Sequence, residues 1–143
     1  MNRVLSAVVL FSVAYFAWNH FGLEDAFSSA PGAGDRILEA AFRDQATDLQ
    51  VEGSGTVIGT LSDDNDGDRH QRFILRLNSG QTLLVAHNID LAPRIATLSK
   101  GDLVSFHGEY EWNSKGGVIH WTHHDPNGLH IPGWLKHQGR TYQ

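Results

Sequence analysis

Hydrophobic and polar positions follow three successive patterns along this chain of 143 residues. Residues 4–18 are uncharged and mostly apolar. Residues 36–45 have apolar side chains at helical spacing, and Asp35 stands where a capping residue is expected. From residue 51 onward apolar and polar side chains alternate, which is typical of strands that bury one face. The predicted helix has an apolar stripe made of Ile37, Leu38, Ala41 and Phe42.

Five strands are predicted from the alternating region. They cover residues 51–61, 70–77, 82–87, 103–112 and 117–124. Turn-forming residues lie at 63–68 and 78–80, and residues 89–100 are long enough for a short helix or an irregular crossover. Three strands, a crossover and two more strands is the order of the OB-fold. We therefore expect a mainly β protein with a small OB-like five-stranded barrel; another small β-barrel is the alternative.

The N-terminal segment is predicted to direct export. Arg3 precedes the apolar residues 4–18, and Glu24 and Asp25 follow them, an asymmetry that puts the N-terminus in the cytoplasm and the rest outside. The stretch is long for a signal peptide and short for a span of about 20 residues, so a cleaved signal and an inner-membrane anchor both stay open. The expected organisation is a signal or anchor at 1–23, a linker and short helix at 24–50, and a periplasmic barrel at 51–143.

The amino-acid composition excludes several kinds of functional site. The chain has no cysteine, which excludes disulfide scaffolds, thiolate zinc sites and cysteine nucleophiles. Its formal net charge of −5 argues against general nucleic-acid binding, although Arg69, Arg72 and Arg76 concentrate positive charge on the second predicted strand. Alternation puts His70 and Arg72 on the same outer face of that strand. Nine histidines are the most unusual feature.

Most of the chemistry lies in the segment 120–130, which reads HWTHHDPNGLH. The turn-forming residues 125–128 should fold His130 back opposite His123 or His124. In the hairpin before it, the register with one apolar face puts Glu109 opposite His120. Imidazoles with carboxylates are ligands for zinc, copper or manganese. The predicted ligand pool is His120, His123, His124 and His130, with Glu109 or Asp125 as a base or an orienting group.

The expected cofactor is therefore a divalent transition metal, with zinc as the first candidate. It would polarise a phosphoryl or acyl oxygen and activate a water. Arg69 and Arg72 would hold an anionic substrate, with His70 beside them. His87 and Asn88 end the third predicted strand and either extend the site or cap the crossover. The same imidazoles could instead act as acid and base without metal, or simply be satisfied by backbone and water.

Four strings resemble an uncharacterised family of small exported bacterial proteins, a domain of unknown function. They are RHQRF at 69–73, AHNIDLAP at 86–93, GEYEWN at 108–113 and HWTHHDP at 120–126. The resemblance covers roughly residues 51–142. It implies a bacterial source and export, and it supplies no activity.

Three functions are compatible with these observations. The first is an exported histidine-rich metal-binding domain that acts as a hydrolase on a phosphodiester-type substrate. The second is a non-catalytic module that binds oligonucleotide, glycan or peptidoglycan fragments through the outer face of the second strand. The third is a structural subunit of an envelope complex. Whether the protein is an enzyme therefore stays open at this stage.

Overall fold

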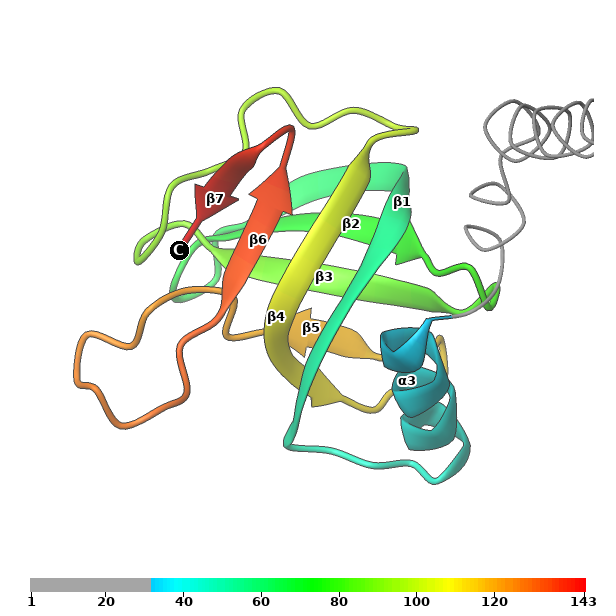
Figure 1. Cartoon of the computed structure of the whole chain (residues 1–143). Coiled ribbons are helices and arrows are strands. Elements are labelled where there is room, and N and C mark those ends of the chain that lie inside the picture. The colour runs from blue at the N-terminus through cyan, green and yellow to red at the C-terminus, as the bar shows by residue number, and fades with distance from the viewer. Residues whose placement is uncertain (1–31) are drawn as a thin grey trace, which may run out of the picture. The chain divides into compact units, whose positions relative to one another are not determined.

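The computed structural model describes residues 32–143 (Figure 1). The predicted signal or anchor at residues 1–23 lies outside the described residues. Within the described part, no helix is both long enough and apolar enough to cross a membrane.

Within residues 32–143, one helix, α3 (Ala33–Arg43), precedes the strands. The helix begins and ends earlier than the predicted residues 36–45. Asp35 lies in its first turn, and Gly32 takes the N-cap position without a side-chain hydrogen bond. The carboxylate of Asp35 instead accepts a hydrogen bond from the backbone N–H of Ser79, at 3.1 Å, and so ties the helix to the turn before β3.

Seven strands follow the helix. They are β1 (Leu49–Asp64), β2 (His70–Arg76), β3 (Thr82–Asn88), β4 (Leu103–Glu111), β5 (Val118–His120), β6 (Trp134–His137) and β7 (Arg140–Tyr142). The mainly β prediction with a short helix is confirmed. The segment between β3 and β4 is an irregular crossover without helix, and β6 and β7 are strands that the alternation did not reveal.

Five of the strands close into a ring in the order β1-β2-β3-β5-β4, because β1 also pairs with β4 (Figure 1). Strands β3 and β5 are parallel, and the other neighbouring pairs in the ring are antiparallel. Strand β1 is longer than predicted because its first half pairs with β4 and its second half with β2. At the changeover, a Cβ on Gly55 would lie 2.9 Å from the carbonyl oxygen of Arg76, so only glycine allows this close approach.

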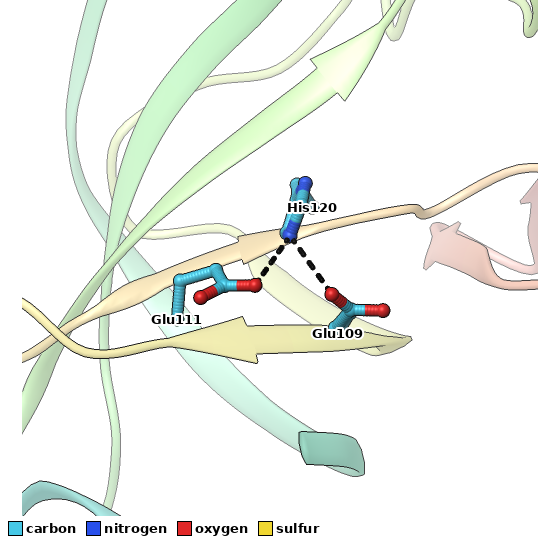
Figure 2. A group of neighbouring side chains, drawn as sticks. All are labelled: Glu109, Glu111 and His120. Carbon is cyan, nitrogen blue, oxygen red and sulfur yellow. Dashed lines mark hydrogen bonds and ion pairs between the residues drawn. The ribbon is translucent and has the colours of Figure 1, made fainter. Parts of the chain in front are cut away.

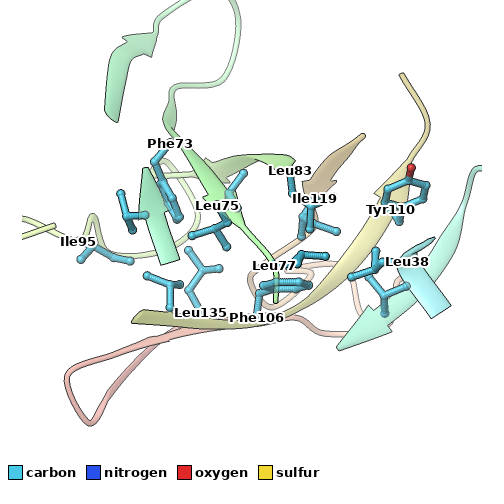
Figure 3. Close-up of a cluster of buried hydrophobic side chains, with 14 of the residues drawn as sticks. Leu38, Phe73, Leu75, Leu77, Leu83, Ile95, Phe106, Tyr110, Ile119 and Leu135 are labelled. Atoms are coloured by element: carbon cyan, nitrogen blue, oxygen red, sulfur yellow. The ribbon is translucent and has the colours of Figure 1, made fainter. Parts of the chain in front are cut away.

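The core fills the ring and the space under α3 (Figure 3). The helix contributes Leu38 and Ala41, whereas Ile37 and Phe42 of the predicted stripe are exposed. The largest buried apolar side chains of the strands are Phe73, Leu75, Leu83, Phe106, Tyr110, Ile119 and Leu135. Because successive side chains of a strand alternate between its faces, the polar neighbours of these residues project outward. This places the carboxylates of β4 and the terminal histidine of β5 on the outside of the ring.

Candidate metal centre

Strands β4 and β5 form an antiparallel hairpin that sets Glu109 opposite His120. The sequence predicts this register, because it puts Tyr110 and Ile119 together on the buried face. The connection depends on Gly117, which has a φ of 108°. A Cβ at this position would lie 2.2 Å from the ring of Tyr110, so a larger residue would displace that ring from the core.

Glu109, Glu111 and His120 form a compact group, called here the carboxylate–histidine cluster (Figure 2). Nε2 of His120 lies 3.5 Å from Oε1 of Glu109 and 3.4 Å from Oε1 of Glu111. One ligand atom from each residue lies within 4.8 Å of the others, and no other such group of His, Cys, Asp or Glu occurs within residues 32–143. All three side chains are half-buried, so they are partly shielded from water and still reachable from outside.

The two carboxylates of the cluster differ in their affinity for protons. Burial raises the pKa of Glu111 to about 7, and hydrogen bonds to Asp48 and Glu109 with their negative charge add to the effect. Burial also acts to raise the pKa of Glu109, but hydrogen bonds with His130 and Glu111 and the charges of the two imidazoles bring it below the usual value. Glu111 therefore keeps its proton to higher pH than Glu109 does. A divalent cation would relieve the same repulsion.

His130 joins the cluster from a separate part of the chain. Its Nε2 bonds to Oε2 of Glu109, and its Nδ1 donates to the carbonyl of Ile131 at 2.8 Å. Burial alone would lower the pKa of His130, but these two hydrogen bonds outweigh it and the pKa is raised. The imidazole ring also stacks on Trp121, with centroids 3.9 Å apart. By contrast, burial is the main cause of a lowered pKa at His120, which favours the neutral form of that ring.

Residues 121–133, called here the His130 loop, hold His130 in place. The predicted turn at 125–128 is confirmed by the bond from Gly128 N–H to the carbonyl of Asp125, at 3.0 Å. The Asp125 carboxylate accepts the backbone N–H groups of Asn127, Leu129 and His130 at 2.9–3.0 Å. At the neck of the loop, Gly133 N–H donates to the carbonyl of His123 at 2.9 Å. Asp125 therefore organises the loop backbone and is not a member of the cluster.

Residues 21–143 match a family described as "Protein of unknown function (DUF3465)". The chain belongs to this family. The match confirms the resemblance inferred from the four sequence strings, and it extends that resemblance toward the N-terminus. No curated protein matches the chain. The DUF3465 description names no activity, so the function of this member has to be argued from the cluster itself.

The structure brings together only part of the predicted ligand pool. His120 and His130 both contact Glu109. His123 is buried, with Nδ1 donating to the carbonyl of His124 at 2.7 Å, and His124 is exposed. The reason is that β5 ends at His120: the next residue, Trp121, has a left-handed φ of 52°, so the predicted strand to residue 124 is broken.

The predicted anion-binding side chains are engaged within the protein. Arg69 forms an ion pair with Asp90 at 2.7 Å. The guanidinium of Arg72 donates through Nε and Nη2 to the carbonyl of Ser62, at 3.0 and 2.9 Å. His70, beside them, donates from Nδ1 to the backbone carbonyl of residue 68 at 2.8 Å. These bonds tie the loop between β1 and β2 to its neighbours.

His87 and Asn88 serve the crossover, which is one of the two roles that the sequence left open. His87 is fully buried, with Nε2 donating to the carbonyl of Pro93 at 3.0 Å and Nδ1 accepting from the Thr122 hydroxyl at 2.7 Å. Oδ1 of Asn88 accepts the backbone N–H groups of Asp90 and Leu91 at 2.9 and 3.1 Å. Both residues therefore fasten the loop that follows β3.

Four contributing residues were not among the predicted site residues. Strand alternation puts Glu111 beside Glu109 on the polar face of β4, but the sequence did not single it out as a ligand. Thr47, whose hydroxyl donates to Oε2 of Glu111, and Asp48 lie in the segment before β1. They reach the cluster only because Leu49 pairs with Tyr110 across β1 and β4. No local pattern indicates that pairing, and none indicates the stack of Trp121 on His130.

Proposed function

We propose that this protein binds a divalent metal ion at the carboxylate–histidine cluster and uses it to hydrolyse an anionic, phosphodiester-type substrate. The observation that supports this best is the set of one imidazole and two carboxylates with ligand atoms within 4.8 Å. Zinc and manganese accept such mixed nitrogen and oxygen ligands, and zinc is the first candidate. When bound, the metal would polarise a phosphoryl oxygen and lower the pKa of a coordinated water.

The surroundings of the cluster suit a cation. Three acidic side chains meet there, because Glu111 interacts with both Asp48 and Glu109. Such a group is destabilised by its own charge unless it holds protons or a cation. His120 offers a neutral ring nitrogen, the form of histidine that ligates metals. His130 bonds to the outer oxygen of Glu109 and would orient that ligand, as partners of metal-bound carboxylates commonly do.

An anionic substrate is supported by the strands next to the cluster. The parallel pairing of Val85 with Ile119 brings Ala86 alongside His120, and Ala86 pairs with Arg72 on its other side. The small side chain of Ala86 therefore separates the cluster from a guanidinium on the same outer face. We propose that Arg72 attracts the second charge of the substrate. The exposed Arg69, paired with Asp90, would contribute only to the local potential.

We further propose that the ring is an OB-like barrel and that the domain works in the periplasm. The strand order β1-β2-β3-β5-β4 and the parallel β3–β5 pair support the first point. The apolar residues 4–18 after Arg3 support the second.

Alkaline phosphatase fused after residue 143 should be active in bacteria, because that enzyme needs its disulfides. An inactive fusion that is still produced would contradict export.

The metal proposal is tested by titrating purified, tag-free protein with Zn²⁺ and with Mn²⁺ in a calorimeter. Wild-type protein should bind one ion per chain. The double substitution Glu109→Gln and Glu111→Gln keeps the side-chain shapes and should weaken binding by more than about 100-fold. Glu39→Gln is the matched control, because Glu39 lies exposed on α3 and outside the cluster. Folded protein that takes up neither ion would contradict the proposal.

Hydrolysis is tested on the metal-loaded protein with bis(p-nitrophenyl) phosphate. We expect turnover that disappears in the Glu109→Gln/Glu111→Gln protein and persists in the Glu39→Gln control. Metal binding without turnover would restrict the function to metal-dependent ligand binding. In that case the second function suggested by the sequence, a non-catalytic binding module, would take the place of the hydrolase.

A further inference from the structure

A cleft of about 610 Å³ lies between helix α3 and strand β6. Its floor is the outer face of β1 and β4, where Ser54 pairs with Ser105 and, on the next strand, Ser105 pairs with Lys136. Trp134 of β6 lines one side of the cleft, and Ile37 of α3, which is 52% exposed, lines the other. The size is that of a site for a small molecule. We call this feature the α3–β6 cleft.

The α3–β6 cleft borders the carboxylate–histidine cluster at Gln50. Gln50 lines the cleft and is the cross-strand partner of Glu109. Along β4, the outward residues Ser105, His107 and Glu109 follow one another, and two residues of a strand span about 7 Å. His107 keeps the junction ordered, because Gln50 Nε2 lies 3.4 Å from its Nε2 and its Nδ1 donates to the carbonyl of Pro132. A molecule one ring longer than a phosphate would therefore reach from the cluster to the Gln50 end of the cleft.

The lining favours a polyhydroxylated ring over a purely apolar one. The floor offers two hydroxyls, one amide and one carboxylate, from Ser54, Ser105, Gln50 and Glu52. These groups can both donate to and accept from ring hydroxyls. Lys136 Nζ lies over the Trp134 ring, 4.2 Å from its centroid, so the ammonium covers part of the indole and brings a positive charge into the cleft. The rest of the indole provides a flat apolar surface for the C–H face of such a ring.

We infer that the α3–β6 cleft binds a sugar ring whose phosphate group lies at the carboxylate–histidine cluster. The inference rests on the proposed function, because the cluster without a cation would repel the phosphate. It adds a substrate class, a sugar phosphate or a phosphodiester between sugars. It also adds Trp134 and Ser54 as the residues that select the ring. The sugar moiety stays unchanged, and the proposed hydrolysis remains at the phosphorus.

The experiment compares two probes on the full-length, metal-loaded protein by calorimetry. Glucose 1-phosphate should bind at least about tenfold more tightly than inorganic phosphate. Trp134→Ala should remove this difference while the affinity for Zn²⁺ stays unchanged. Ser54→Leu, which fills the floor and leaves the indole in place, should do the same if Trp134→Ala does not fold. Leu103→Ala is the matched control, since Leu103 is exposed on β4 and does not line the cleft.

The outcomes separate this inference from the proposed function. Zn²⁺ binding with equal affinity for both probes overturns the sugar assignment and leaves the metal site standing. A preference for glucose 1-phosphate that both cleft variants retain also overturns it, because the ring would then bind elsewhere. If no metal binds, the proposed function fails. Glucose 1-phosphate binding that depends on Trp134 would still support the cleft, and its absence would overturn both.

Discussion

Trp121 stacks face to face on His130, with ring centroids 3.9 Å apart and an angle of 7° between the ring planes. Trp121 reaches this position with a left-handed φ of 52°, a conformation that a bulky residue rarely adopts. The same backbone turn lies one residue after His120, where β5 ends. One residue therefore ends the strand at the cluster and supports the imidazole that bonds to Glu109.

The side chain and the backbone conformation of Trp121 should therefore affect the free energy of unfolding in opposite directions. Both Trp121→Ala and Trp121→Gly lose the stack, but glycine adopts a positive φ without a steric penalty. The free energy of unfolding of Trp121→Gly should therefore be about 1 kcal/mol higher than that of Trp121→Ala. Urea denaturation measures the difference. Equal stabilities of the two variants would show that the left-handed backbone is relaxed in the absence of the indole.

Gly133 at the neck of the His130 loop should not tolerate even alanine. A Cβ there would lie 1.9 Å from the carbonyl oxygen of Trp121 and 2.5 Å from that of His107. Since both contacts are with backbone, Gly133→Ala should lower the free energy of unfolding by more than about 2 kcal/mol. Gly59→Ala is the control, because a Cβ at Gly59 meets nothing within 4 Å. Thermal unfolding of both proteins checks the prediction, and similar melting temperatures would contradict it.

Asp125 is expected to act through the loop backbone. Asp125→Ala removes the acceptor for three backbone N–H groups, so amides at Asn127, Leu129 and His130 should exchange faster with solvent. Amide hydrogen exchange measures this change directly. Affinity for Zn²⁺ should fall by less than in the Glu109→Gln/Glu111→Gln protein, because Asp125 orients His130 and is not a proposed ligand. A loss of affinity as large as in that protein would instead make Asp125 a ligand.

Buried His87 predicts a dependence of stability on pH. Burial is the main reason that its pKa falls from 6.5 to about 4. Below pH 6.5 His87 of the unfolded chain binds a proton, whereas His87 of the folded protein binds one only at about pH 4. The free energy of unfolding is therefore at its full value above pH 6.5 and should fall by about 3 kcal/mol as the pH is lowered to 4.

Urea denaturation of wild-type protein and His87→Gln between pH 4 and 7.5 measures this contribution. Glutamine keeps a donor for the Pro93 carbonyl and an acceptor for the Thr122 hydroxyl, and it does not titrate. His87→Gln should therefore show a shallower loss of stability at low pH. His124→Gln is the control, because His124 is exposed. An equal slope in His87→Gln and wild-type protein would assign the loss to other groups.

The sequence by itself determined the mainly β class, four of the strands nearly to their ends, and the pairing of Glu109 with His120. Alternation has a period of two, so a register error at the hairpin would have exposed Tyr110 and Ile119 to water. The burial of these two apolar side chains therefore specifies which polar side chains face outward together. The family resemblance could also be inferred from sequence, because the motif strings are contiguous.

Only the tertiary structure decided which histidines belong to the cluster. His123 and His124 stand next to each other in the sequence, yet the left-handed turn at Trp121 takes both away from Glu109 and the loop returns His130 to it. The burial of His87 and the contact of Asp48 with Glu111 likewise depend on the packing of distant segments. Residue pattern reports which face of a regular strand is buried. The path of a loop depends on single hydrogen bonds and close contacts, such as those of Asp125 and Gly133, which no periodicity records.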